Sequence, residues 1–330
     1  MPLLQVISHM CTSPVSPIRV LTGQILQAFE NANPATAPLL RKAVATGRID
    51  AAIDLDLVAD IPRGSFAEVI DGSPTTIHLH IIYLEMLWAF TYGMFVSYEH
   101  EMRETMLHMG LPVSAPGYSE TVRRRAGNLL CWSKKLRHAY SKWPADAPSP
   151  ISYRNEEKEL SGKVNTIFLA AVALILHHEF CHASQGHTTP GWTREQILEL
   201  EKEADDFAHH QFLDGLSAEH DKRIRGWSVL IPPLSNLYLV EGPRGLFQEK
   251  HPHVHHRIAH ALSRLNFSEN ENQDYFNGLC LSALTTFMIE HHILDNDFHR
   301  KPGLRKSFER MSDALEYFLG ELDSLYEQRA

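Results

Sequence analysis

Paired cysteines are missing from this chain of 330 residues. Its four cysteines lie far apart and form no CxxC pair; they are Cys11, Cys131, Cys181 and Cys280. A chain of this length with so few cysteines shows no disulfide framework, so we expect a reducing compartment, the cytoplasm.

An excess of basic residues is missing too, because the formal net charge is −9. This charge argues against a general nucleic-acid binder, and we interpret the basic run at residues 123–125 as a solvated helix face.

Long apolar runs free of polar residues are also absent. The run at residues 77–98 is long enough to span a bilayer, but it carries two histidines and Glu85. A charged residue at bilayer depth costs about 3 kcal/mol on insertion scales. The run at residues 167–176 is too short to span. No positive charge precedes Arg19, so the charged start of a signal peptide is lacking. We therefore expect no membrane span.

Hydrophobic periodicity predicts a mainly α protein (α+β) with a small β-sheet. Residues 1–64 carry weak helical patterns interrupted by prolines. Two β-prone runs, Phe66–Ile70 and Thr75–His80, flank the turn signal Asp71-Gly72-Ser73-Pro74 and predict a hairpin. Helices are then expected at residues 81–108, 121–142, 164–185, 194–213, 255–266, 276–293 and 304–326. We expect one domain over 1–330, with an N-terminal region (residues 1–143) that holds the hairpin 66–80, a proline-rich hinge 144–150, and a helical region (residues 151–330).

A motif of metal-ligand type lies in the predicted helix 164–185. The sequence His178-Glu179-Phe180-Cys181-His182 has the pattern HExxH. Residues four apart share one helix face, so His178 and His182 can reach one cation. Glu179 lies one step round the helix, where its carboxylate can act as general base towards a water molecule. The apolar run before the motif indicates a buried helix, in which two histidines and a glutamate need a partner such as zinc.

The next predicted helix, 194–213, supplies a third ligand. Thr193 and Gln196 form a capping box at its start. Glu201 and Asp205 fall on its apolar stripe, whereas Glu203 falls on the polar face. We therefore prefer Glu201 as the third zinc ligand over its rival Glu203. Asp205 can accept the free ring N–H of a ligand histidine.

These motifs resemble those of a known group of enzymes. HExxH followed by Glu201-Lys-Glu-Ala-Asp205 is similar to the gluzincin metallopeptidases. Together with the stretch Tyr83–Tyr92, the motifs resemble the Lit phage-exclusion peptidase family over roughly residues 66–260. The resemblance implies a zincin-like helical metallopeptidase domain that requires Zn²⁺. It also implies a cytoplasmic endopeptidase acting on one folded host protein, and the target of the Lit peptidase itself is translation elongation factor Tu.

A histidine-rich segment follows. The segment His251–Ile258 resembles the HPxxxxR(I/L) element of HtpX-type and CAAX-prenyl-protease gluzincins, which implies that His251 and Arg257 lie near the metal. A histidine there can stabilise an oxyanion as a catalytic group. The alternative is a helix N-terminus with a solvated histidine face. Nearby His253, His255 and His256 form either a second metal site or, as we prefer, solvated side chains.

Two further expectations concern the substrate. Gluzincins commonly bind the substrate backbone along an edge strand, and we assign that role to Thr75–His80. A peptidase with unrestrained activity in the cytoplasm would be harmful, so we expect restraint by an activating partner or a closed cleft.

The alternative functions are a regulatory metalloprotease of the ImmA/IrrE kind that cuts a repressor, and a non-catalytic metal-binding protein. The former is disfavoured because no helix-turn-helix is evident.

Overall fold

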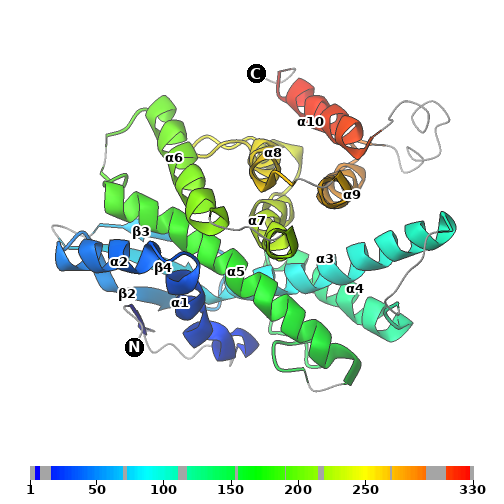
Figure 1. The fold of residues 1–330 in the computed structure, drawn as a ribbon, viewed down its shortest axis with the longest axis horizontal. Coiled ribbons are helices and arrows are strands. Elements are labelled where there is room, and N and C mark those ends of the chain that lie inside the picture. The colour runs from blue at the N-terminus through cyan, green and yellow to red at the C-terminus, as the bar shows by residue number, and fades with distance from the viewer. Residues whose placement is uncertain are drawn as a thin grey trace. The chain divides into compact units, whose positions relative to one another are not determined.

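The chain is mostly helical and has one small sheet (Figure 1). The computed structural model describes residues 4–7, 16–69, 73–110, 117–152, 155–189, 191–214, 219–267, 270–294 and 310–327. The predicted mainly α (α+β) class is thereby confirmed. Parts of three predictions lie outside the described residues: Cys11, residues 70–72 of the hairpin, and the first residues of the helix predicted at 304–326.

The chain divides into two compact units. Unit 1 comprises Met1–Trp192 and Glu203–Asp214, and unit 2 comprises Thr193–Lys202 and Gly215–Ala330. The division passes through helix α6 (Arg194–Leu213), which is continuous. The organisation as one domain therefore stays a prediction.

The sheet of unit 1 has the strand order β1-β2-β4-β3. Its strands are β1 (Gln5–Ile7), β2 (Ile49–Asp56), β3 (Phe66–Glu68) and β4 (Thr75–His80). The predicted pairing of β3 with β4 is confirmed as antiparallel, whereas β2 pairs with β1 and β4 in parallel. The assignment of Thr75–His80 as an edge strand is wrong. Both edges of β4 are hydrogen-bonded, because β2 lies on one side and β3 on the other, and its residues Ile77 and Leu79 are buried.

The first 64 residues hold more strand than expected. Helices η1 (Pro17–Leu21), α1 (Thr22–Asn31) and α2 (Thr36–Ala45) account for their helical patterns. Strands β1 and β2 were not predicted. The pairing of β2 with β4 is interrupted by a register shift between Ile49 and Ile53, so the alternation of buried and exposed residues along β2 is irregular. The signal of period two is lost there.

Unit 1 also contains the second part of α6 and three further helices. Helix α3 (Ile81–His108) starts directly after β4 and packs against α4 (Glu120–Lys135), which ends earlier than predicted. Helix α5 (Asn155–Gln185) packs on α1 and α3. By length and composition α3 and α5 could cross a membrane, but 89% and 61% of their most apolar windows are buried in the structure. Core helices pass the same test, so this evidence for a span is weak.

Unit 2 contains the first part of α6 and the remaining elements. They are α7 (Glu219–Leu239), η2 (Pro243–Leu246), α8 (Val254–Leu265), α9 (Asn270–Glu290) and α10 (Met311–Glu327). Helix α7 was not predicted, because it contains Pro232 and Pro233. Proline removes a helical hydrogen bond and costs about 3 kcal/mol. The neighbouring Ile231 and Leu234 are fully buried, so tertiary packing outweighs this cost.

Candidate metal centre

The HExxH motif occupies the last two turns of α5. The apolar residues 167–176 ahead of it are mostly buried, which makes α5 a core helix. His178 and His182 lie one turn apart, and their Nε2 atoms are 3.0 Å from each other. The helix ends at Gln185, and the φ of 77° at the following Gly186 lies in the left-handed region that favours glycine. The turn places His187 beside His182.

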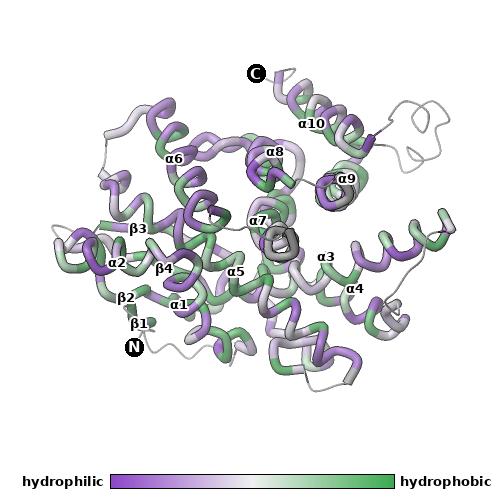
Figure 2. Tube along the Cα trace, in the orientation of Figure 1, coloured by the Kyte–Doolittle hydropathy of each residue, from purple (hydrophilic) through white to green (hydrophobic). Residues whose placement is uncertain are grey.

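Helix α6 carries the third donor. Its predicted capping box is confirmed, since the Thr193 backbone N–H donates to Gln196 Oε1 (2.9 Å) and the Gln196 N–H donates to Thr193 Oγ1 (3.3 Å). Figure 2 shows α6 as predominantly hydrophilic, with apolar residues interspersed. Glu201 is nevertheless buried, at 8% exposure. A buried carboxylate needs hydrogen bonds or a cation.

His178, His182 and Glu201 are brought together. Each offers one ligand atom, and in the described part of the chain these atoms all lie within 4.8 Å of one another. In a tetrahedral site with Zn–N bonds of about 2.0–2.1 Å, two ligand nitrogens are about 3.3 Å apart. The observed 3.0 Å between the imidazoles requires only a small side-chain rotation to admit the ion. Two imidazoles and one carboxylate therefore fit zinc and leave a fourth position open.

Each histidine of this group has a partner at its other ring nitrogen. His178 Nδ1 lies 2.9 Å from Asp205 Oδ1, one helical turn after Glu201 on α6. His182 Nδ1 lies 3.1 Å from His187 Nδ1. His187 Nε2 in turn lies 3.7 Å from Glu203, the rival ligand on the polar face. A proton on Nδ1 of each histidine, facing these neighbours, would leave Nε2 free to bind a metal.

His251 contacts the carboxylate of the group. Its Nδ1 lies 2.7 Å from Glu201 Oε2, and its side chain is 46% exposed. A ring N–H that donates to Glu201 would orient the carboxylate for a bound ion. The structure thus gives His251 a contact with a candidate ligand, and its action on an oxyanion stays a prediction.

Glu179 has its own partner from a distant part of the chain. The Ser65 hydroxyl donates to Glu179 Oε1 at 2.8 Å, across 114 residues of sequence. Glu179 itself is 6% exposed. Ser65 directly precedes β3, which is one of the two edge strands of the described sheet, and β3 packs against α5. One carboxylate oxygen is thereby oriented by Ser65.

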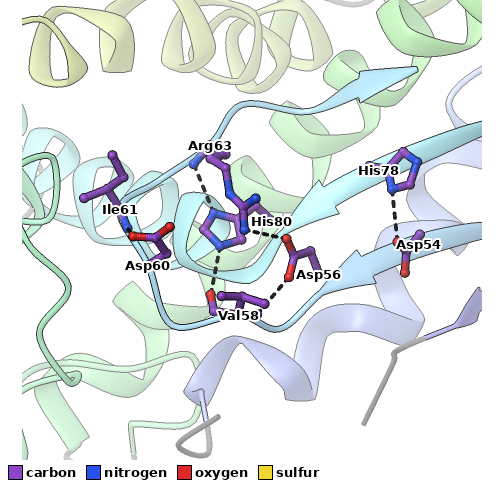
Figure 3. Close-up of polar contacts among 8 residues, drawn as sticks. All are labelled: Asp54, Asp56, Val58, Asp60, Ile61, Arg63, His78 and His80. Carbon is purple, nitrogen blue, oxygen red and sulfur yellow. Dashed lines mark hydrogen bonds and ion pairs between the residues drawn. The ribbon is translucent and has the colours of Figure 1, made fainter. Parts of the chain in front are cut away.

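The loop that carries Ser65 is anchored by His80 (Figure 3). The Arg63 backbone N–H donates to His80 Nδ1 at 3.0 Å, and His80 Nε2 donates to the Val58 carbonyl at 2.9 Å. Burial lowers the pKa of His80, which keeps the ring neutral in this tautomer. The Arg63 guanidinium also pairs with Asp56 at 2.6 Å. The end of β4 therefore fixes the loop and, through it, Ser65.

Two other residues of the motif region have packing roles. His177 is fully buried, with Nε2 3.0 Å from Thr36 Oγ1 and Nδ1 2.7 Å from the Ala173 carbonyl. Cys181 is 1% exposed, and burial raises the pKa of its thiol to about 12. It remains a neutral core side chain.

Sequence reasoning missed His187 and Ser65. His187 carries a local signal, because a glycine that ends a helix returns the following residue towards the last turn. Ser65 carries no such signal, because its contact with Glu179 depends on how β3 packs against α5.

Comparison with known proteins gives three findings. A family model described as Peptidase U49 matches residues 77–280, more than half of the chain and the region that holds α5, α6 and His251. The cell death peptidase of Escherichia coli (strain K12) is 28% identical over 216 residues, which are 63% of this chain and 68% of that protein. No solved structure matches the chain.

Proposed function

Because the chain belongs to the Peptidase U49 family, we propose that this peptidase is a zinc-dependent endopeptidase that cuts one specific host protein. The observation that carries the proposal is the convergence of His178, His182 and Glu201 beside Glu179. Structural zinc sites usually have four protein ligands, whereas this group offers three and leaves a position for water. That difference favours catalysis over a purely structural ion.

Each residue of the site has a separate role in the proposed hydrolysis. A bound zinc ion would supply a Lewis acid that polarises a peptide carbonyl and acidifies a water molecule. Glu179 accepts the proton of the attacking water and passes it to the leaving amine. The Ser65 hydroxyl holds Oε1 of Glu179, so that the other oxygen faces the reacting groups. Asp205, His187 and His251 hold the ligands in their binding orientation.

We assign the substrate backbone to β3. This strand is last in the order of the described sheet, so the backbone groups on its outer side can pair with an extended peptide. It follows Ser65 directly, which brings a bound peptide close to Glu179. The side chain of Phe66 is 46% exposed and would contact an apolar side chain of the substrate.

The test of the catalytic role uses two matched substitutions. Glu179→Gln keeps the shape of the side chain but cannot accept a proton, so it should retain zinc and abolish hydrolysis. Glu199→Gln removes a charge from the 76% exposed Glu199 on α6 and should leave hydrolysis unchanged. Full activity of the Glu179→Gln protein would refute the mechanism.

Elongation factor Tu is the substrate that we propose for the first assay. The proposal is supported by the similarity to a cell death peptidase and by the resemblance to the Lit family. We further propose that the enzyme acts in the cytoplasm and that an activating partner restrains it. Incubation of purified chain with folded elongation factor Tu should give one cut, and only after the partner is added. Equal cutting of many unfolded proteins without a partner would contradict the restraint.

A further inference from the structure

A second group of metal-type donors lies where α8 begins, against α10. His255 Nε2 is 2.9 Å and His256 Nε2 is 2.7 Å from the same oxygen, Oδ1 of Asp323. Together the three residues form one of two groups in the described chain whose ligand atoms all lie within 4.8 Å of one another. The side chain of His255 is fully buried, whereas His256 and Asp323 are half-exposed. All belong to unit 2.

The surroundings hold the imidazoles in place. The ring of His253 lies 5.4 Å from that of His256 and 4.8 Å from Tyr326, measured between centroids. Phe247 packs 5.9 Å from His255 and 5.0 Å from Tyr326. An aromatic wall therefore covers the inner side of the group, while its outer side is open to solvent. Such a low-dielectric wall strengthens the attraction between a cation and the carboxylate.

We propose that His255, His256 and Asp323 bind a zinc ion at a second site, separate from the HExxH group. Imidazole nitrogen with one carboxylate oxygen is a donor set that suits zinc, whereas Ca²⁺ and Mg²⁺ prefer oxygen ligands alone. Successive residues on a helix point about 100° apart, yet both rings here aim Nε2 at one point. Asp323, on the facing helix α10, supplies the negative charge that balances a cation.

The donor distances fit an ion after a modest expansion. Ligand atoms in a tetrahedral zinc site are about 3.3 Å apart, and the nitrogen–oxygen distances are 2.7 and 2.9 Å. The HExxH histidines show the same contraction, with 3.0 Å between their nitrogens. His256 and Asp323 are half-exposed, so they can rotate outward. Water can complete the coordination on the open side.

The ion would join two helices of unit 2, because it would tie α8 to α10. Four residues before His255 lies His251, whose Nδ1 contacts Glu201. A zinc ion at the start of α8 would therefore steady the segment that orients Glu201. The proposal for this second ion does not depend on the proposed peptidase activity.

An ion-free explanation predicts a different outcome. A carboxylate oxygen has two lone pairs and can accept two N–H donors without a metal. In that case the contacts of Asp323 are hydrogen bonds alone, and the site takes up no zinc. Counting the zinc bound per chain distinguishes the two.

The experiment measures zinc in the full-length chain after removal of all metal and dialysis against buffered zinc. The parent carries Glu179→Gln to prevent self-digestion. We expect two zinc ions per chain in the parent and one after either His256→Ala or Asp323→Asn. His210→Ala is the matched control, because His210 is a 60% exposed histidine that pairs with Asp214 at the end of α6. This control should keep two.

Removal of the first centre separates the two proposals. His178→Ala in the parent should leave one zinc ion, and His178→Ala with Asp323→Asn should leave none. If the HExxH group bound no zinc, the parent would hold one ion and Asp323→Asn would remove it. The second site is overturned if Asp323→Asn and His256→Ala, both folded by circular dichroism, hold as much zinc as the parent.

Discussion

Asp205 offers a direct test of how the candidate metal centre is built. Its Oδ1 lies 2.9 Å from His178 Nδ1, and both side chains are about seven-eighths buried (13% and 12% exposed), so solvent screens the pair little. Loss of such a partner typically weakens metal binding 10- to 100-fold, about 1.4–2.8 kcal/mol. We expect about a tenfold loss of zinc affinity for Asp205→Asn, which keeps the shape, and up to about a hundredfold loss for Asp205→Ala.

The assay is competition for zinc against a chromophoric chelator at pH 7. The chain carries Asp323→Asn, so that only the HExxH centre is titrated. Glu199→Gln serves as the control, because it removes a charge from the same helix at an exposed position. Zinc affinities within twofold of the parent for both Asp205 variants would refute the reasoning that Asp205 orients His178.

Substitutions at three other positions test the site and the core. Ser65→Ala should lower kcat about 10- to 100-fold, since a hydrogen bond to a charged group contributes about 1.5–3 kcal/mol. KM and zinc content should not change, and Ser65→Thr should restore part of the rate. A raised KM with normal kcat would contradict the role. Arg125→Met should reduce the free energy of unfolding by about 3–5 kcal/mol, because it leaves the buried Glu157 carboxylate without the guanidinium with which it pairs. Urea denaturation measures the change, and a loss below 1 kcal/mol would contradict the prediction. Burial raises the pKa of Glu85 from 4.5 to about 7, so the folded state holds a proton that the unfolded state releases, and wild-type stability falls by up to about 3 kcal/mol between about pH 4.5 and 7. Glu85→Gln should therefore stabilise the chain above pH 7 and hardly at pH 5. Equal melting temperatures of both proteins at pH 8.5 would contradict this.

The elements that the sequence predicts well have strong local patterns. Helices α3, α5 and α6 follow from long apolar or amphipathic runs, and the β3–β4 pair follows from two β-prone runs around a turn signal. Strand β2 was missed because its register shift breaks the alternation of buried and exposed residues. Helix α7 was missed because two prolines argue against a helix that tertiary packing stabilises.

The same distinction holds at the candidate site. His178 and His182 are paired by helical spacing, and Glu201 is chosen over Glu203 by the face of a helix that it occupies, so local geometry suffices. The expectation that Thr75–His80 forms an edge failed, because the position of a strand within a sheet depends on the other strands. Ser65 could not be found for the same reason. Its contact with Glu179 exists only once the loop before β3 is anchored by His80.

The most direct test of the zinc endopeptidase is a comparison of new protein N-termini in cells that express the wild-type chain or Glu179→Gln. Both proteins should hold the same amount of zinc, because Glu179 orients water and is not a ligand. We expect one or a few new N-termini with the wild-type chain, elongation factor Tu among their sources, and none with Glu179→Gln. The same new N-termini from both proteins would contradict the central claim.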